Sequence, residues 1–200
     1  MAITNGYATL NQIKAAARIN DAIDDSLLEM AVESASRMID AECDRNFYSS
    51  GTAAVTRDFI PNDPYTVDTD DLTSISSVKL DDSGDLTYAI TLATTDYQTE
   101  PVNQRVSGNP FPITRLRMIG DYLLPIWGKQ ATVRITGIYG FTPVPIQITQ
   151  ACVIQAGRIY KRNDSFLGVA GFGDLGAMRV GKVDPDVAMM IRPFKKFAAV

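Results

Sequence analysis

The sequence has 200 residues, a length that fits one domain or one domain carrying a sizeable insertion. Its hydrophobic fraction of 46% is enough for a buried core, and no apolar run approaches the roughly 20 residues of a membrane-spanning helix. A net charge of −4 argues against a strongly basic duplex-binding surface, and the absence of histidine removes the commonest general base and metal ligand.

The first 50 residues predict two helices. Thr9 and Gln12 have the spacing of a capping box, which predicts a short helix from residue 10. Asp24, Asp25 and Ser26 predict the start of a second helix that runs to about Arg45, and Ser26 and Glu29 repeat the capping-box spacing. Its apolar residues recur at helical spacing and form one continuous stripe: Leu28, Val32, Ala35, Ile39 and Cys43.

The sequence changes in character between Thr52 and Gly137, where short runs of β-forming residues alternate with turn residues. No helical period interrupts these runs, so they predict a small antiparallel sheet or barrel. The predicted strands cover residues 54–60, 75–80, 86–92, 113–118 and 131–136.

Helical patterns return after Gly140. Pro143 and Pro145 suit a helix entrance, and a glycine-rich loop follows this helix at 163–181. Asp184 and Pro185 then predict the N-cap and first residue of a last helix. Pro193 is expected to kink or end this helix and to free the tail from Lys195 onward. The apolar stripe of this helix is Val187, Met190, Ile191, Phe194 and Phe197.

The cysteines and the amino terminus give further expectations. Cys43 and Cys152 lie among apolar residues without CxxC spacing, and we interpret them as buried thiols rather than as a disulfide or metal pair. Residues 1–11 lack the basic and apolar regions of a signal peptide, so synthesis in the cytoplasm is expected.

Other motifs predict no catalytic, cofactor or metal site. Residues 171–176 match GxGxxG, but a helix is predicted before them and no acidic residue follows at the required distance, which favours a flexible loop. Tyr122 and Trp127 fit core or edge packing better than a ligand cage, although the sequence does not decide between them. The following acidic residues lack EF-hand spacing and are interpreted as turn-forming or solvating: Asp68, Asp70, Asp71, Asp81, Asp82 and Asp85.

Two segments about ninety residues apart resemble the head–tail connector (adaptor or head-completion) proteins of tailed double-stranded DNA bacteriophages of the siphophage type. The first is Ala35–Asp40 with Arg45–Phe47, and the second is Val133–Pro145, running into Ile148 and Ala151. The resemblance implies an α+β fold in which a bundle of about four helices carries an inserted small antiparallel sheet or barrel. Residues 1–51 and 138–200 would form the helical core, 52–137 the inserted β-rich subdomain, and 184–200 a C-terminal amphipathic helix and tail.

The resemblance also implies a structural function in the virion. Such proteins form a homo-oligomeric ring, commonly of twelve subunits, beneath the portal, where the ring joins the DNA-filled head to the tail and extends the DNA channel. The implied partners are the portal and a stopper or tail-completion protein, with genomic DNA passing through the lumen without sequence-specific binding and with no membrane involved. Assembly is expected in the host bacterial cytoplasm.

The resemblance gives candidate contact residues and leaves alternatives. The C-terminal segment is the expected portal-binding part, and docking on the core of its own chain is the alternative. The portal-binding candidates are Met190, Ile191, Arg192, Phe194, Lys195, Lys196 and Phe197. Arg37, Asp40 and Arg45 are candidates for a subunit interface or for structural ion pairing, since Arg37 and Asp40 can meet on one helix face. A stopper or tail terminator, or a small cytosolic enzyme, remains an alternative.

Overall fold

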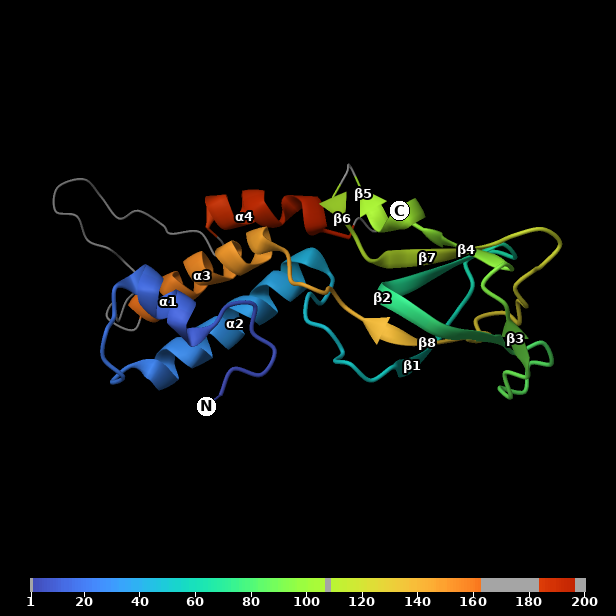
Figure 1. Cartoon of the computed structure of the whole chain (residues 1–200), viewed down its shortest axis with the longest axis horizontal. Coiled ribbons are helices and arrows are strands. Elements are labelled where there is room, and N and C mark those ends of the chain that lie inside the picture. Colours follow the sequence, from blue (N-terminus) through green and yellow to red (C-terminus); the bar gives the residue numbers. More distant parts are fainter. Residues whose placement is uncertain (1, 107–108, 163–183, 197–200) are drawn as a thin grey trace. The chain divides into compact units, whose positions relative to one another are not determined.

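The structure is a computed structural model that describes residues 2–106, 109–162 and 184–196. The chain forms two compact units, shown in Figure 1. The helical unit consists of residues 1–48 and 144–200, and the β unit consists of residues 49–143. The chain therefore leaves the helical unit once and returns to it once.

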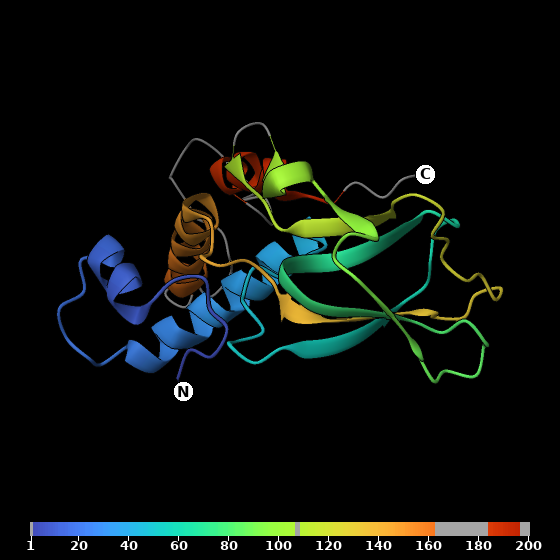
Figure 2. The same ribbon diagram turned by 45° about the vertical axis from the view of Figure 1, so that its right-hand side comes forward.

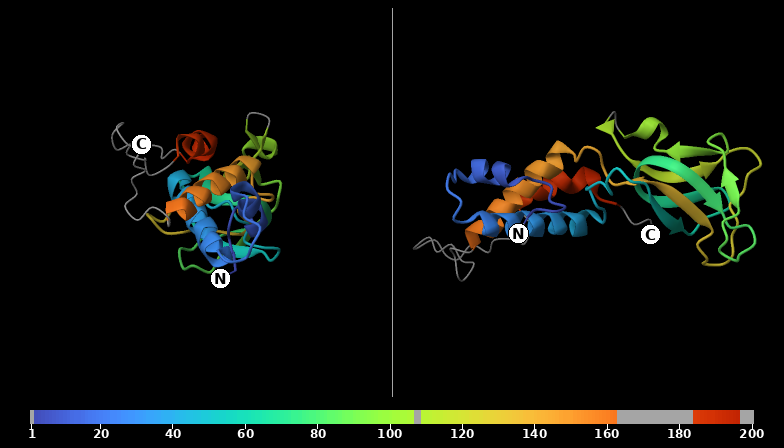
Figure 3. Two further views of the ribbon diagram at one scale, coloured as in Figure 1. Left: turned by 90° about the vertical axis from the view of Figure 1, so that its left-hand side faces the viewer. Right: turned by 60° about the horizontal axis from the view of Figure 1, so that its bottom comes forward.

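In the residues that the structure describes, the helical unit contains four α-helices and a 3₁₀ turn after the last of them (Figure 3). The predicted capping box of the first helix is confirmed, because the Gln12 N–H donates to Thr9 Oγ1 and the Thr9 N–H donates to Gln12 Oε1. Among the described residues, no helix combines the length and apolarity that crossing a bilayer requires. The elements are α1 (Leu10–Ala17), α2 (Asp25–Cys43), α3 (Ile146–Lys161), α4 (Pro185–Ile191) and the turn Arg192–Phe194.

The second helix starts at the predicted residues Asp24 and Asp25, but the predicted capping box of Ser26 and Glu29 is wrong. Helix α2 begins at Asp25, and Asp24 is at the N-cap without a side-chain capping bond. The Asp24 carboxylate instead accepts a hydrogen bond of 2.6 Å from the hydroxyl of Tyr160 on α3. A contact with a residue distant in sequence thus replaces the local cap, and sequence spacing alone carries no signal for it.

Small residues on α3 let it pack closely against α2. Ala151, Cys152 and Ala156 are buried on α3, and Cys152 Sγ lies 3.4 Å from Ser36 Oγ of α2. Cys43 and Cys152 are both buried free thiols, which confirms their interpretation as small core side chains. The predicted stripe of α2 is wholly buried, together with Ile13, Ile148, Val187 and Ile191.

The β unit is built from antiparallel strands, which confirms the predicted sheet (Figure 2). The main sheet has the order β1-β8-β2-β7-β4, with β3 also paired to β2, and β5 and β6 form a separate pair. The strands are β1 (Val55–Phe59), β2 (Thr66–Leu80), β3 (Ile90–Leu92), β4 (Tyr97–Glu100), β5 (Arg105–Val106), β6 (Asn109–Pro110), β7 (Ile113–Met118) and β8 (Val133–Tyr139); a 3₁₀ turn covers Val102–Gln104.

Strand β2 corrects two predictions. It starts at Thr66 rather than at residue 75, so Asp68, Asp70 and Asp71 belong to a strand and not to a turn. Asp68 and Asp70 point to solvent and pair with arginines of other strands, which compensates for the low β propensity of aspartate. The second correction concerns β3, the strand paired with the end of β2. The predicted strand at 86–92 is too long, because only Ile90–Leu92 is paired.

Gly137 of β8 allows the close approach of β2. The pairing of β2 with β8 shifts register between Leu72 and Ser74 and again between Ile75 and Ser77. A Cβ atom on Gly137 would lie 2.3 Å from the Ser74 carbonyl oxygen. Only a residue without a side chain fits between these strands at this point.

The two chain segments that connect the units are hydrogen-bonded to each other within the β unit. The Ser50 N–H donates to the Tyr139 carbonyl at 2.8 Å, and the Tyr139 N–H donates to Ser50 Oγ at 3.0 Å. Entry to and exit from the β unit are therefore adjacent.

Candidate interaction surfaces

A hydrogen-bonded cluster centred on Tyr7 contains two of the three residues predicted for a subunit interface or a structural role. Tyr7 is only 3% exposed; its hydroxyl donates to Asp40 and accepts from the Phe47 N–H at 2.8 Å. Arg37 Nε lies 2.8 Å from Asp40 Oδ2, and an Arg37 Nη donates to the Asn5 carbonyl. The cluster ties the N-terminal segment and the end of α2 together.

Burial controls the protonation of this cluster. It raises the pKa of Asp40 above its ordinary value, although the hydrogen bond from Tyr7 and the charge of Arg37 act in the opposite direction. Burial and the neighbouring Asp40 also raise the pKa of Tyr7 well above its ordinary value, so Tyr7 stays protonated and remains a donor. These contacts give Arg37 and Asp40 a structural role within the chain.

Arg45 lies just after the C-terminal end of α2, and its N–H donates to the Asp40 carbonyl at 3.3 Å. Its side chain is half-buried. A role of Arg37, Asp40 or Arg45 at a subunit interface stays a prediction.

The end of the C-terminal helix packs on its own unit. Ile191 is 1% exposed, and the Phe194 ring meets Phe47 edge-on at a centroid distance of 5.7 Å. Lys195 forms an ion pair with Glu42, and the Lys196 N–H donates to the Cys43 carbonyl at 2.9 Å. Lys195 and Lys196 are therefore both held by contacts with α2. The prediction that Pro193 frees the tail from Lys195 onward is wrong for these two residues.

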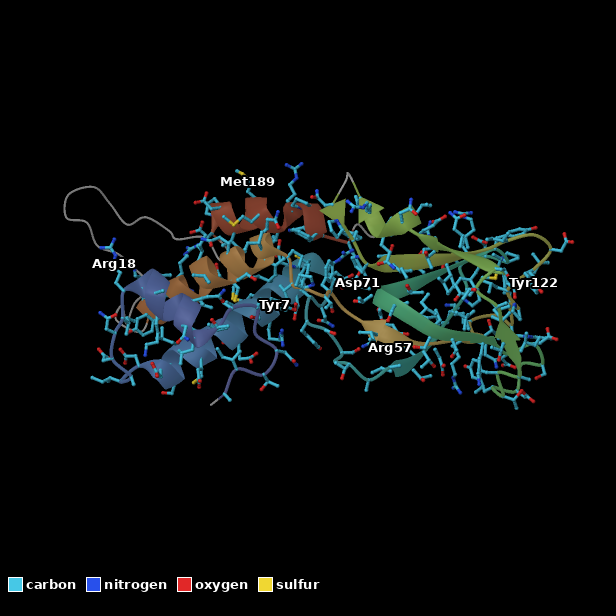
Figure 4. The ribbon with its side chains drawn as sticks, viewed as in Figure 1. Tyr7, Arg18, Arg57, Asp71, Tyr122 and Met189 are labelled. Carbon is cyan, nitrogen blue, oxygen red and sulfur yellow. The ribbon has the colours of Figure 1, made fainter. Side chains whose placement is uncertain are left out.

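The predicted portal-binding residues differ in accessibility. Arg192 is exposed, Met190, Phe194, Lys195 and Lys196 are half-buried, and Phe197 lies outside the described residues. Met189, labelled in Figure 4, is 74% exposed, although the sequence analysis did not single it out. Its position off the predicted apolar stripe was the available signal.

The start of α4 is fixed by the predicted Asp184 cap, which is confirmed. Asp184 Oδ1 accepts from the Asp186 N–H at 2.9 Å, and Asp184 Oδ2 lies 3.0 Å from Arg158 of α3. Helix α4 is thus held at both ends.

Paired charges cover the solvent face of the β unit. Arg134 forms two hydrogen bonds with the carboxylate of Asp58, which hold the pKa of Asp58 below its ordinary value. Because each arginine faces a carboxylate, the surface offers no excess positive charge to a polyanion. The ion pairs are Arg57–Asp70, Arg115–Asp68, Arg117–Glu100 and Arg134–Asp58, at 2.5–2.7 Å.

The acidic turn at 81–85 binds its own backbone. Asp81 accepts hydrogen bonds from the N–H groups of Gly84 and Leu86, each at 2.9 Å. Asp85 accepts from Ser83 and Thr87. Within the part of the chain that the structure describes, no group of three histidine, cysteine, aspartate or glutamate residues could hold a metal ion. The GxGxxG sequence at 171–176 lies outside that part.

A loop of the β unit exposes large apolar side chains. Trp127 is 51% exposed, and its ring lies over Gly84, while Tyr122 is about half exposed. Leu124 anchors the loop, because its side chain is buried and its N–H donates to the Pro64 carbonyl at 2.7 Å. Trp127 is therefore packed on one face and open to solvent on the other.

A cavity of about 510 Å³ in the β unit is lined mainly by residues of β2, β4 and the turn Val102–Gln104. Tyr97 is its one ionisable lining residue, and burial raises the pKa of Tyr97. The other lining residues are uncharged: Thr73, Ser74, Ile75, Thr94, Gln98, Thr99, Val102, Asn103, Gln104, Ile113 and Ile119. The cavity thus lacks the converging acid and base groups of a hydrolytic or proton-transfer site.

Comparison with known families gives a match in the N-terminal part of the chain. Residues 7–74 match the family model of the phage gp6-like head-tail connector proteins. This match confirms the resemblance to head–tail connectors. It covers α1, α2, β1 and the first part of β2, whereas the second segment of the resemblance, residues 133–145, lies beyond it.

Solved structures share the fold over the whole chain. The chain is 12% identical to a protein in the neck of an empty gene transfer agent (GTA) particle computed with C6 symmetry, with a TM-score of 0.56 over 100% of this chain and 95% of the other. It is 14% identical to a protein in the virion of a native GTA particle, with a TM-score of 0.55 and the same coverage. A neck of the native particle computed with C12 symmetry gives 14% identity and a TM-score of 0.51, covering 100% and 94%. No curated protein matches the sequence.

Proposed function

We propose that this chain is a structural neck protein of a tailed phage or phage-like particle, which forms a ring beneath the portal and joins the head to the tail. The observation that carries the proposal is the head–tail connector match at residues 7–74. Chains of the same fold occur in GTA necks computed with C6 and C12 symmetry, and this supports a ring, with twelve copies as the expected number.

The mechanism is mechanical. Head-to-tail contacts between identical copies close into a ring, and ring closure adds the weak contacts together. In this proposal the β unit is a subdomain inserted into the helical core at about residues 52–137, and the segment from Asp184 faces the portal. Met189 and Arg192 supply the exposed apolar and basic groups for that contact.

The ring would let DNA pass without holding it. The ion-paired face of the β unit and the net charge of −4 give phosphates little to bind. The other expected partner is a stopper or tail-completion protein on the tail side, with assembly in the bacterial cytoplasm. No catalytic step is part of the proposal.

A stopper or tail terminator built mainly from a β-barrel fits less well. Helix α2 runs from Asp25 to Cys43 and forms the centre of the helical core, a feature that such a barrel protein would not need. The small-enzyme alternative lacks a matching site in the described cavity.

Native mass spectrometry of the chain with and without the portal protein of the same phage tests the proposal. We expect a monomer or weak oligomer alone and a closed ring of defined copy number on the portal. A monomer in both samples would contradict the proposed function.

A further inference from the structure

Strand β2 has an open backbone edge in the middle of the sheet. On one side it pairs with β8 from Leu72 to Leu80. On the other side it pairs with β7 as far as Leu72 and with β3 only from Val78. Within the described residues, no strand pairs with residues 73–77 on this second side, so the stretch keeps backbone N–H and C=O groups without a ladder partner.

A second open edge lines the same cavity. Strand β4 ends the order of the main sheet, so the edge of Tyr97–Glu100 that faces away from β7 also has no partner strand in the part that the structure describes. Residues 73–75 of β2 and 97–99 of β4 line the cavity of about 510 Å³, a volume typical of ligand pockets. The cavity and its two open strand edges are here called the open-edge groove.

The chemistry of the open-edge groove suits an uncharged, extended polypeptide. Unpaired strand edges offer main-chain hydrogen bonds to an added strand, whatever its side chains. Ile75, Ile113 and Ile119 supply apolar contacts, and the remaining lining residues are uncharged polar residues, one valine and Tyr97.

Charged residues flank the groove but do not line it. Asp96 accepts a hydrogen bond from the Ala93 N–H at 2.7 Å, and Glu100 pairs with Arg117 of β7 at 2.6 Å. Arg105 lies just beyond the turn Val102–Gln104 and is exposed. A charged side chain placed in the groove would therefore meet no opposite charge among the lining residues.

The chain contains an uncharged segment that has no role in the proposed function. Residues 165–173 belong to the predicted glycine-rich loop and carry no charge, whereas Asp164 and Asp174 border them. Glycines make this segment a weak strand by itself, which suits addition to a preformed edge. In its centre, large apolar and small residues alternate with the two-residue period of a strand: Leu167, Gly168, Val169 and Ala170.

The length of this connection and the place of its ends favour the groove of another copy. Residues 163–183 lie outside the described residues and connect Arg162 to Asp184. These ends are held near each other, because Arg158 of α3 pairs with Asp184 at 3.0 Å. A connection of this length with adjacent ends can extend at most about 35 Å from the helical unit. It leaves from the end of α3, about 24 Å along the helix from the side where the chain arrives from its own β unit.

We infer that residues 165–173 of one copy add as a strand to the open-edge groove of a second copy, and that this exchange joins neighbours in the ring. The inference rests on the proposed function, because a head-to-tail ring gives every copy one donated segment and one filled groove. The open edge of β2 is only about 17 Å long, so each contact is small, and ring closure adds many of them together.

A synthetic peptide of residues 164–174 tests the groove without the portal. Added to the isotope-labelled chain at millimolar concentration, which matches the effective concentration of a tethered segment, it should shift the NMR signals of residues 73–77 and 97–100. Ser74→Glu puts a charge into the neutral lining and should weaken binding at least about tenfold. The matched control is Ser76→Glu, the same substitution at an exposed β2 position outside the lining, which should leave binding unchanged.

A second peptide tests strand addition itself. N-methylation from Leu167 to Ala170 keeps every side chain but removes the amide donors, and should weaken binding at least about tenfold. This control does not depend on whether a groove variant folds.

Titration of purified portal with a chain that lacks residues 164–174, followed by native mass spectrometry of the copies bound, tests the contact between copies. The shortened connection still joins Arg162 to Asp184, because these ends are held near each other. We expect binding of the first copy to be unchanged and half-filling of the ring to need at least about tenfold more chain.

The other outcomes separate the inference from the proposed function. Absence of peptide-induced shifts in both the full and the shortened chain would overturn the groove as a strand-binding site, as would equal binding of the N-methylated peptide. Shifts in the shortened chain alone would place the segment in the groove of its own chain and overturn the exchange. Normal ring filling by the shortened chain would overturn the exchange and leave the proposed function standing. Peptide binding without any ring of the original chain on portal would overturn the proposed function and the exchange, but not the groove.

Discussion

Tyr7 shows how one buried hydroxyl can hold separate parts of the helical unit. It connects the segment before α1, the α2 residue Asp40 and the backbone after α2 at Phe47. The bond with Phe47 is buried and the bond with Asp40 is half-buried, so loss of the hydroxyl leaves a buried N–H and a carboxylate without this partner.

Tyr7→Phe should lower the free energy of unfolding by about 1–3 kcal/mol, because the ring still fills its site but both hydrogen bonds disappear. Chemical denaturation monitored by circular dichroism measures the change. Tyr65→Phe removes a hydroxyl from a residue that is about half exposed, and should change stability by less than about 0.5 kcal/mol. Equal effects of the two substitutions would contradict the role assigned to Tyr7.

The Arg134–Asp58 pair predicts a pH effect. The pKa of Asp58 is lowered in the folded chain, so this pair stabilises the fold above the unfolded pKa of aspartate and loses that effect as pH falls through the folded pKa. In Arg134→Gln the pKa of Asp58, measured by NMR titration, should rise toward the ordinary value of about 4. The pKa of Asp85 is lowered by hydrogen bonds from Ser83 and Thr87, and should stay low in the variant.

At the scale of elements, β2 and β8 depend on a single glycine. Gly137→Ala places a methyl group against the Ser74 carbonyl of β2. Because this carbonyl belongs to the backbone and cannot rotate away, the two strands must separate. We expect a loss of about 1–3 kcal/mol in thermal or chemical unfolding.

The same substitution in α3 should have the opposite sign. Gly157 lies inside a helix, and its nearest neighbour to an added methyl group is Ile13 Cδ1 at 3.9 Å. Gly157→Ala should therefore stabilise the chain by about 0.5–1 kcal/mol. A destabilised Gly157→Ala, or a neutral Gly137→Ala, would contradict the packing described for these positions.

Elements were predictable where local signals determine them. The Thr9 capping box and the Asp184 cap each act within one turn of helix. The sequence predicted the first from the spacing of Thr9 and Gln12 and the second from the pair Asp184 and Pro185. The start of β2 was missed because arginines of other strands neutralise Asp68 and Asp70. The exposure of Leu27, Met30 and Met38 was not predicted, because these residues lie outside the single apolar stripe recognised on α2.

At the scale of the whole molecule, the two units have separate cores. The β-unit core contains Leu72, Leu116 and Ile135, and all of its members lie between residues 49 and 143. The sequence indicated this division through its change from helical to alternating patterns. The sequence could not show which apolar side chains are exposed. The exposure of Met189 and Trp127 depends on which of their faces are covered by residues distant in the sequence.

The separate core predicts that residues 49–143 fold alone. We expect the isolated β unit to show strand-rich circular dichroism and one cooperative thermal transition, because its core needs no side chain from the helical unit. In Leu72→Ala, which removes a fully buried side chain, the transition should weaken by about 2–5 kcal/mol. An isolated unit without a cooperative transition would contradict this independence.

The paired Ser50–Tyr139 crossing has a consequence for a joint that carries mechanical load. Two backbone strands connect the units, and they run side by side where they enter the β unit. Tension between the units is therefore shared by two covalent tethers rather than borne by one. A single peptide-bond break in either tether would leave the other intact, so the units would stay attached after damage that separates an ordinary two-domain protein.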